Sequence, residues 1–328
     1  MIRRRMILAM LCLSTIISAR AMGMASAELY TTQAYTYGRF EARIQHAPGD
    51  GVVSSFFLWK NGSEVAGAYW NEVDFEKVGA NCGMTTNARY GTTVSNHSQT
   101  KTMPGNSCGE YHTYGIDWTP SYIAWSVDGS EFRRETGDTA TAFSQNASAG
   151  MTIHFNLWPG NSSFGGNINN TTLPVHEYIS WVQYSSYDNG AFTVQWRQDF
   201  EDSALPTGWA VGDWASAYNL STHNPKNVGF VNGIAVLSLT TDNATGDPGN
   251  PPADDGTTSP TGGTGGSTSS TGGSSGTGSG SSGGCRVMAG SKRVGPSLLS
   301  ILMVAAWPAL RARAKRRRDR GDRHLCSR

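Results

Sequence analysis

Hydrophobic and polar residues alternate over many short stretches between residue 28 and about residue 243. Examples are GRFEARIQ, VVSSFFLW, NEVDFEKV, YIAWSVDG and AFTVQWRQDF. Successive side chains of a β-strand point to opposite faces, so this period of two predicts strands with one buried face. Turn residues such as Gly and Asn separate the stretches, and we find no convincing period of 3.6 residues in this region. The pattern predicts an all-β sandwich or barrel, and residues 28–243 are an ordinary length for one such domain.

Both ends of the chain differ in composition from this region. The first residues carry three arginines, then an apolar run, and then the small residues Ala25-Ser26-Ala27. This order is typical of a signal peptide, which we place at residues 1–27, and it predicts export. Residues 244–284 are almost wholly Gly, Ser, Thr, Pro and Asp, a composition that predicts a flexible linker.

Residues 285–328 follow the linker and begin with Cys285. An apolar run from Val294 to Leu310 comes next, and the basic cluster RARAKRRRDR follows it. The run is short for a membrane span but adequate for a processed anchor, with the basic residues on the cytoplasmic side. The pattern resembles the C-terminal sorting signals of myxobacterial surface proteins, which implies a link to the cell envelope through Cys285. The alternative is a disordered cationic tail.

Charge is distributed unevenly along the chain, so the formal net charge of +1 is misleading. Residues 1–27 carry four Arg and no acids, and residues 286–328 carry twelve Lys or Arg against two Asp. That leaves 10 basic and 23 acidic side chains in residues 28–285, a net charge of −13. So acidic a body argues against nucleic acid and anionic membranes as partners.

Two of the cysteines, Cys82 and Cys108, lie in the predicted domain. In an exported protein, two cysteines most simply form one disulfide bond, so we expect them to pair. A metal pair is the alternative, but no CxxC motif or suitably spaced histidine accompanies them.

The stretch YWNEVDFEKVG places three carboxylates, Glu72, Asp74 and Glu76, at every second position. On a strand they share one face, where their charges repel. Paired carboxylates hydrolyse glycosidic bonds, and crowding raises the pKa of at least one of them. On a flat strand the Cα atoms of Glu72 and Glu76 would be about 13 Å apart, so a retaining mechanism requires the two side chains to lean toward each other. Three acids on a solvated face are the alternative.

The flanking stretches make this motif specific. Trp70 precedes it, YGRFEARIQHAPGDGVVSSFFLW lies upstream, and YHTYGIDWTPSYIAWSVDG and FNLW lie downstream. Together they resemble glycoside hydrolase family 16, and within it the bacterial 1,3-1,4-β-glucanases (lichenases). The resemblance implies a jelly-roll β-sandwich of two curved antiparallel sheets and retaining hydrolysis of mixed-linkage β-glucan, without a cofactor for the chemistry. We also expect a monomer.

Roles for individual residues follow from this resemblance. It implies that Glu72 is the nucleophile, that Glu76 is the general acid/base, and that Asp74 tunes their protonation. Aromatic and amide side chains would line the cleft and bind the glucan; the matching positions are Phe57, Trp59, Asn61, Trp70, Asn156, Trp158 and Trp214.

Two positions depart from the family pattern. His154 stands where relatives with a circularly permuted chain, described below, carry Arg. Phe164 replaces a tryptophan of the cleft. Both changes are expected to alter binding of the sugar. Family members often hold a structural calcium ion, and Asp199 with the carbonyl of Gly233 matches part of that site.

The order of the segments indicates a circular permutation. Ordinary lichenases open with a segment that resembles residues 196–243, whereas here that segment follows the last strand of the other part. This order resembles the Fibrobacter-type glucanases, and KNGSE at residues 60–64 also does. We therefore expect residues 191–243 to complete the same sandwich. The alternative is a separate binding module, for which about 50 residues are few.

Two other functions stay open at this point. Xyloglucan hydrolysis or transglycosylation is an alternative within the family, although the permuted order and KNGSE weigh against it. A glycan-binding surface module without turnover is the alternative outside enzymes. Binding alone does not need both Glu72 and Glu76, so their presence favours an enzyme.

Overall fold

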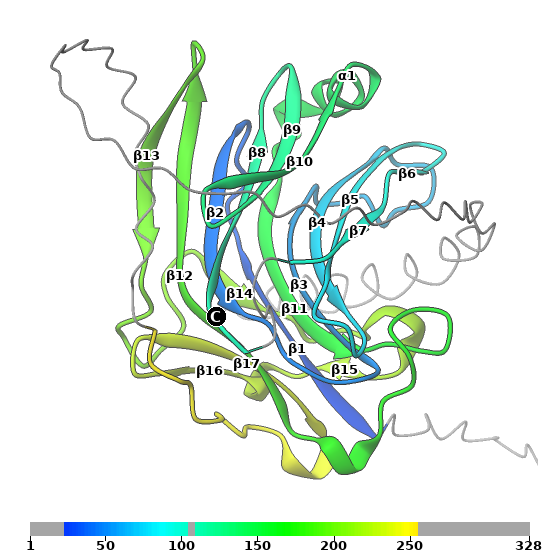
Figure 1. The fold of residues 1–328 in the computed structure, drawn as a ribbon, viewed down its shortest axis with the longest axis vertical. Helices are drawn as coiled ribbons and strands as arrows, with labels where there is room; N and C mark the ends of the chain where they lie inside the picture. Colours follow the sequence, from blue (N-terminus) through cyan, green and yellow to red (C-terminus); the bar gives the residue numbers. More distant parts are fainter. Residues whose placement is uncertain (1–22, 104–108, 255–328) are drawn as a thin grey trace, which may run out of the picture.

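The computed structural model describes residues 23–103 and 109–254, and Figure 1 shows their fold. Two curved β-sheets lie face to face, and nearly all neighbouring strands run antiparallel. The predicted all-β jelly roll is thus confirmed. Sequence segments that lie far apart become neighbours in each sheet, because strands from both ends of the described chain pair with strands from its middle.

The first sheet carries the acidic strand. Its strands in spatial order are β14 (Trp209–Val211), β1 (Met24–Thr31), β11 (Thr152–Pro159), β3 (Val52–Trp59), β4 (Trp70–Val78) and β5 (Met84–Gly91), with β6 (Ser95–Asn96) and β7 (Gln99–Lys101) at the edge.

The second sheet covers one face of the first. Its strands in spatial order are β10 (Ser130–Thr136), β9 (Tyr122–Val127), β8 (His112–Trp118), β2 (Gly38–Gln45) and β12 (Val175–Asp188). On the far side of β12, its first half pairs with β17 (Ile234–Thr241) and its second half pairs with β13 (Ala191–Gln198). β16 (Val228–Val231) pairs with β17. The start of β1 pairs with β17 and with β15 (Thr222–His223), and so joins the two sheets.

The helical segments of the described residues are short and lie in the connections. They are α1 (Asp138–Ser144) and the 3₁₀ turns η1 (Ala147–Ala149), η2 (Asn170–Thr172), η3 (Ala217–Asn219), η4 (Pro225–Asn227) and η5 (Asp242–Ala244). None of the helices in the described ranges is long and apolar enough to cross a membrane.

Side chains from alternate positions of both sheets fill the space between them. On β4 these are Val73 and Phe75, both fully buried. Phe56 on β3 stacks on Phe155 of β11 with ring centroids 5.2 Å apart. The period of two then directs the other residues of β4 to the opposite face of the sheet, away from this core. We call that opposite face the site face.

Residues 191–243 contribute β13 to β17 to these same two sheets. β14 extends the first sheet beside β1, and β17 pairs with both β12 and β1. The segment therefore adds strands to the existing sandwich and does not form a second one.

The structure differs from the predicted boundaries at both ends of the domain. Strand β1 begins at Met24, within the stretch assigned to the signal peptide. Residues 244–254, assigned to the linker, contact the body: Asp254 forms an ion pair with Arg43 at 2.8 Å, and both side chains are less than a tenth exposed. Sequence composition missed this contact because a single buried charge pair leaves no pattern along the chain. The predicted anchor at residues 285–328 lies outside the described residues, as does most of the linker.

Candidate active site

Strand pairing sets the predicted carboxylates among polar and aromatic neighbours on the site face. Three rows run across β3, β4 and β5, and residues opposite one another share a face. The rows are Trp59–Glu72–Arg89, Phe57–Asp74–Asn87 and Ser55–Glu76–Thr85. The structure therefore brings the three acids together with the predicted aromatics of β3. It also adds Arg89, a cation that the sequence analysis did not single out.

Two of the three carboxylates are withdrawn from solvent. Glu72 is 9% exposed and Asp74 is 4% exposed, while Glu76 is partly exposed. The alternative of three acids on a solvated strand face is therefore wrong for Glu72 and Asp74. Burying like charges this close together is costly unless protons or cations neutralise some of them.

Burial and mutual repulsion shift the protonation of two of the acids. Burial, with the charge of Glu72 second, raises the pKa of Glu76 from 4.5 to about 7. Burial, then the charges of Glu72 and Glu76, raise the pKa of Asp74 well above its usual value. The positive charge of Arg89 opposes both shifts. Near neutral pH the cluster can therefore hold a proton on Glu76, as a general acid requires.

Glu72 is held by two donors on a single oxygen. Trp70 Nε1 donates a hydrogen bond to Glu72 Oε2 at 2.7 Å, and the Arg89 guanidinium donates to the same atom at 2.7 Å. Arg89 also lies over the Trp70 ring, 4.6 Å from its centroid. Charge-assisted bonds of this kind fix a carboxylate in place. Glu72 is thus a preorganised carboxylate with a defined orientation.

Four buried polar atoms near the carboxylates have no hydrogen-bond partner among the described residues: Ser55 Oγ, Asp74 Oδ1, Asn87 Oδ1 and Asn156 Oδ1. They come from four adjacent strands, since Asn156 on β11 lies opposite Ser55 on β3. Buried polar atoms normally find a partner, and leaving one unmade costs about 1–3 kcal/mol. A ligand rich in hydroxyl groups would provide partners for these four atoms.

Aromatic side chains flank the carboxylates on both sides. Phe57, Trp59 and Trp70 form one cluster, in which the two indoles meet edge to face with centroids 5.0 Å apart. On the other side, Trp158 stacks on Phe164 at 5.9 Å and lies 6.1 Å from the Tyr218 ring. Apolar faces of sugar rings pack on such aromatic surfaces. Phe164 thus occupies an aromatic position beside Trp158.

A buried polar network holds the neighbouring part of the site face. Glu28 Oε1 lies 2.8 Å from His154 Nδ1, and Glu28 Oε2 accepts a hydrogen bond from Trp214 Nε1 at 3.0 Å. The His154 ring stacks on Tyr30 with centroids 5.0 Å apart. His223 lies 3.3 Å from Glu28 Oε2. His154 therefore serves as a structural partner of Glu28, and this pair positions Trp214.

Two further predictions concern residues away from the carboxylates. Asn61 lies in the turn after β3, where it is exposed. Cys82 lies in the turn after β4, but Cys108 lies outside the described residues, so their pairing stays a prediction.

The predicted calcium site at Asp199 and Gly233 stays a prediction. Gly233 lies beside the main-chain carbonyl of Asp199, but the Asp199 carboxylate accepts a hydrogen bond from Arg197 at 2.6 Å. Calcium prefers six to eight oxygen ligands. Within residues 23–103 and 109–254, no group of three or more His, Cys, Asp or Glu side chains could hold a metal ion.

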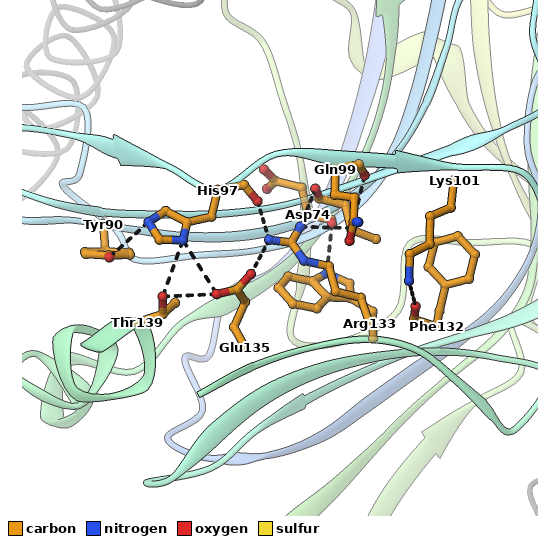
Figure 2. Close-up of polar contacts among 11 residues, drawn as sticks. Asp74, Tyr90, His97, Gln99, Lys101, Phe132, Arg133, Glu135 and Thr139 are labelled. Carbon is orange, nitrogen blue, oxygen red and sulfur yellow. Dashed lines mark hydrogen bonds and ion pairs between the residues drawn. The ribbon is translucent and has the colours of Figure 1, made fainter. Parts of the chain in front are cut away.

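Arg133 braces the edge strands behind the acidic strand, as Figure 2 shows. Its guanidinium donates to the Thr86 carbonyl at 2.8 Å and to Glu135 at 2.6 Å, and it stacks on Trp125 at 4.6 Å. Trp125 Nε1 in turn donates to the Asp74 carbonyl at 3.0 Å. A polar hollow of about 420 Å³ borders this network, and none of the three carboxylates lines it. The network supports the backbone of β4 from the core side.

The family assignment agrees with this geometry. The model of the glycosyl hydrolases family 16 matches residues 11–197, more than half of the chain. The protein belongs to glycoside hydrolase family 16. Within the family, it is 35% identical to a beta-glucanase of Fibrobacter succinogenes over 257 residues, which cover 74% of this chain and 71% of that protein.

Other family 16 relatives match a shorter part. A beta-glucanase of Bacillus subtilis is 31% identical over 157 residues, 47% of this chain and 61% of that protein. The solved beta-glucanase of Bacillus licheniformis is 26% identical and covers 50% of this chain and 78% of its own, with a TM-score of 0.42. The family model and the match to the Fibrobacter protein support a beta-glucanase-like glycoside hydrolase.

Sequence reasoning missed several residues that the structure brings to the site face, among them Arg89, Glu28, Tyr30 and Asn87. Arg89 and Asn87 could have been found by counting back from the turn between β4 and β5, since an antiparallel register pairs them with Glu72 and Asp74. Glu28 and Tyr30 carried no such signal. Their strand pairs with one more than a hundred residues away.

Proposed function

We propose that this protein is an endo-glucanase that hydrolyses mixed-linkage 1,3-1,4-β-D-glucan with retention of anomeric configuration. The observation that carries the proposal is the contrast between two carboxylates of one strand. Glu72 is anchored by two hydrogen-bond donors, whereas the pKa of Glu76 is raised to about 7. One fixed anionic carboxylate and one that holds a proton near neutral pH are what a retaining glycosidase uses.

The mechanism follows from these two states. In the first step, Glu72 attacks the anomeric carbon and forms a C–O bond while the glycosidic C–O bond breaks. Glu76 gives its proton to the departing oxygen. In the second step, the Glu76 carboxylate takes a proton from water as the water oxygen attacks the same carbon, and Glu72 leaves with its electron pair. Burial and the charges of Glu72 and Glu76 raise the pKa of Asp74, which favours its neutral form and so limits repulsion between the two glutamates.

The rest of the site face suits a polysaccharide. Unpaired polar atoms of Ser55, Asn87 and Asn156 are available for sugar hydroxyls, and aromatic side chains lie on both sides of the carboxylates. Binding subsites on both sides of the reacting bond favour cleavage within a chain. The relatives in Fibrobacter and Bacillus are described as beta-glucanases, which supports a β-glucan as the substrate.

We also propose that the chain is circularly permuted. The match to the Fibrobacter protein spans 257 residues, whereas the match to the Bacillus subtilis protein spans 157 and the family model ends at residue 197. The difference is explained if this chain has the same order of segments as the Fibrobacter protein and a different order from the Bacillus subtilis protein. The hairpin of β12 and β13, in which Asp188 lies opposite Ala191, supports the proposal because the former ends would be joined there. The start of β1 pairs with the end of β17, where the chain of an ordinary relative would continue.

Cellular placement is part of the same proposal. We infer that the protein is exported through its signal peptide and held at the cell envelope by residues 285–328, and that it acts as a monomer. The apolar leader, the Gly/Ser-rich linker and the basic end support this arrangement.

Reducing-sugar release on four polymers tests the function: barley β-glucan, laminarin, carboxymethylcellulose and xyloglucan. We expect the wild-type protein to release sugar from β-glucan alone and Glu72→Gln to release none, with both proteins folded by circular dichroism. Release from xyloglucan would instead assign the other branch of the family. Binding without release on any polymer would make the protein a glycan-binding module.

A further inference from the structure

The two carboxylate oxygens of Glu72 have different surroundings. Oε2 accepts hydrogen bonds from Trp70 and from Arg89, each at 2.7 Å. No described residue donates to Oε1 by the same criteria. Arg89 stands directly opposite Glu72 in the register of β4 and β5, so the contact needs no long reach across the site face.

We propose that Arg89 is a positioning residue that, together with Trp70, holds Oε2 of Glu72 and leaves Oε1 as the oxygen that attacks the anomeric carbon. This inference rests on the proposed function and adds to it the choice of attacking atom. In the glycosyl-enzyme, Oε1 is the ester oxygen bonded to the sugar and Oε2 is the carbonyl oxygen. When water cleaves the ester, the negative charge returns to the carboxylate in contact with both donors.

The Arg89 side chain is itself held in place by its neighbours. Its Nε donates to Asn96 Oδ1 at 2.8 Å, its guanidinium lies over the Trp70 ring, and its side chain is 15% exposed. A planar guanidinium can stack on a ring while its N–H groups donate within its plane, whereas an ammonium group has no plane to stack. The side chain is therefore preorganised and needs no rearrangement when substrate binds.

The charge of Arg89 also sets the balance among the acids. The charged or titratable groups that face Glu76 are Glu72 and Asp74 on its own strand, Arg89 on β5 and Tyr218 in η3. Arg89 is the cation among them, and it lowers the pKa values of Asp74 and Glu76. Loss of this charge should raise the pKa of Glu76, an effect that packing alone would not cause.

Three variants separate positioning from packing: Arg89→Gln removes the charge, Arg89→Lys keeps it, and Asn96→Ala removes only the contact to Nε. We expect Arg89→Gln to lower kcat/KM on barley β-glucan roughly 10- to 100-fold, the worth of a hydrogen bond to a charged group. The pH above which its activity falls, which we call the basic limit, should move to a higher value. Arg89→Lys should keep the wild-type limit with a smaller loss, and Asn96→Ala should stay within about threefold of wild type. An unchanged limit in Arg89→Gln, or activity within twofold of wild type, would overturn the proposal.

Two readouts do not depend on turnover. Titration of Glu76 by NMR with ¹³C-labelled glutamate should give a higher pKa in Arg89→Gln than in the wild type. Crystal structures of the two proteins should show Glu72 Oε2 held in one and released or rotated in the other. If these changes appear while the wild-type protein hydrolyses none of the polymers, the proposed function fails and the positioning role stands.

A different observation concerns the start of the mature chain. Residues 24–27 lie in β1, and Ala25, Ser26 and Ala27 are each 3% exposed or less. Ser26 Oγ lies 3.0 Å from His223 Nδ1, and Asn227 Nδ2 donates to the Ala25 carbonyl at 2.9 Å. Cleavage after Ala27 would remove these contacts and place a charged amino group on fully buried Glu28.

We propose that the leader is cut after Ala21, where Ala19-Arg20-Ala21 offers the small residues that signal peptidase requires. This site leaves all of β1 in the mature protein. Expression with export in a Gram-negative host, followed by N-terminal sequencing and intact mass, should find Met22 first. Ala21→Leu should leave the precursor uncut. A mature chain that starts at Glu28, or a wild-type chain that keeps its leader, would overturn this proposal.

Discussion

Glu28 Oε1 lies 2.8 Å from His154 Nδ1, although the two residues are 126 positions apart in the sequence. Both are buried on the site face, on the paired strands β1 and β11. The other oxygen of Glu28 holds the indole of Trp214, so this one carboxylate joins a strand near the start of the described chain to a loop near its end. The contact with Glu28 thus gives a physical role to His154, which differs from the residue of the family pattern.

Glu28→Gln is expected to weaken glucan binding, because the amide cannot accept from both His154 and Trp214 as a carboxylate does. A hydrogen bond to a charged group is worth about 1.5–3 kcal/mol, so KM should rise roughly tenfold or more while kcat changes less. Steady-state kinetics on barley β-glucan provide the measurement. In a double-mutant cycle with Trp214→Phe, the two effects should be clearly less than additive. Strict additivity would show that the two side chains act separately.

The pH dependence of activity should report the protonation of Glu76. As general acid this carboxyl must carry its proton, and its pKa is raised to about 7 by burial and by the Glu72 charge. We expect kcat/KM to fall above about pH 7. The matched comparison removes the need for a general acid: activity on a chromogenic substrate whose leaving group needs no protonation should fall much less above that pH. A profile that is flat to pH 9 on β-glucan would contradict the assignment of Glu76.

The pH dependence of stability should report the same group. The pKa of Glu76 is higher in the folded state than its ordinary value of 4.5, so its stabilising contribution is full below pH 4.5 and is lost as pH rises through about 7. Glu76→Gln, which cannot ionise, should therefore gain in melting temperature relative to wild type between these pH values. The wild type and Glu76→Gln are to be melted at pH 4, 6 and 8. A difference that does not grow with pH would contradict this prediction.

Residues 244–254 are expected to stabilise the domain despite their linker-like composition. Asp254 forms a buried ion pair with Arg43, and Tyr111 donates to the Pro252 carbonyl at 3.2 Å. Removing one partner of a buried pair costs about 3–5 kcal/mol, which corresponds to roughly 6–20 °C in a domain of this size. A chain that ends at residue 243 should melt lower than one that ends at 254, and Asp254→Asn in the longer chain should reproduce most of the loss. Equal melting temperatures would show that the contact is dispensable.

Much of the fold could be predicted because strands with one buried face leave a period of two in the sequence. That period identified the stretches that became β2, β3, β4, β9 and β13, and it placed the three acids of β4 on one face. It could not tell which strands are neighbours. The joining of β1 to β11 and β17 depends on contacts between residues far apart in the chain, whose pairing no local pattern encodes.

The candidate site divides in the same way. By itself, the sequence determined the spacing of Glu72, Asp74 and Glu76 and the aromatic residues around them, because both are properties of short segments. Only the tertiary structure decided that Arg89 holds Glu72 and that Glu28 holds Trp214. The tertiary structure also determined how deeply the carboxylates are buried, and the shifts of their pKa values follow from that burial. Electrostatic effects act through space and depend on solvent exclusion, so they exist only after distant strands have packed together.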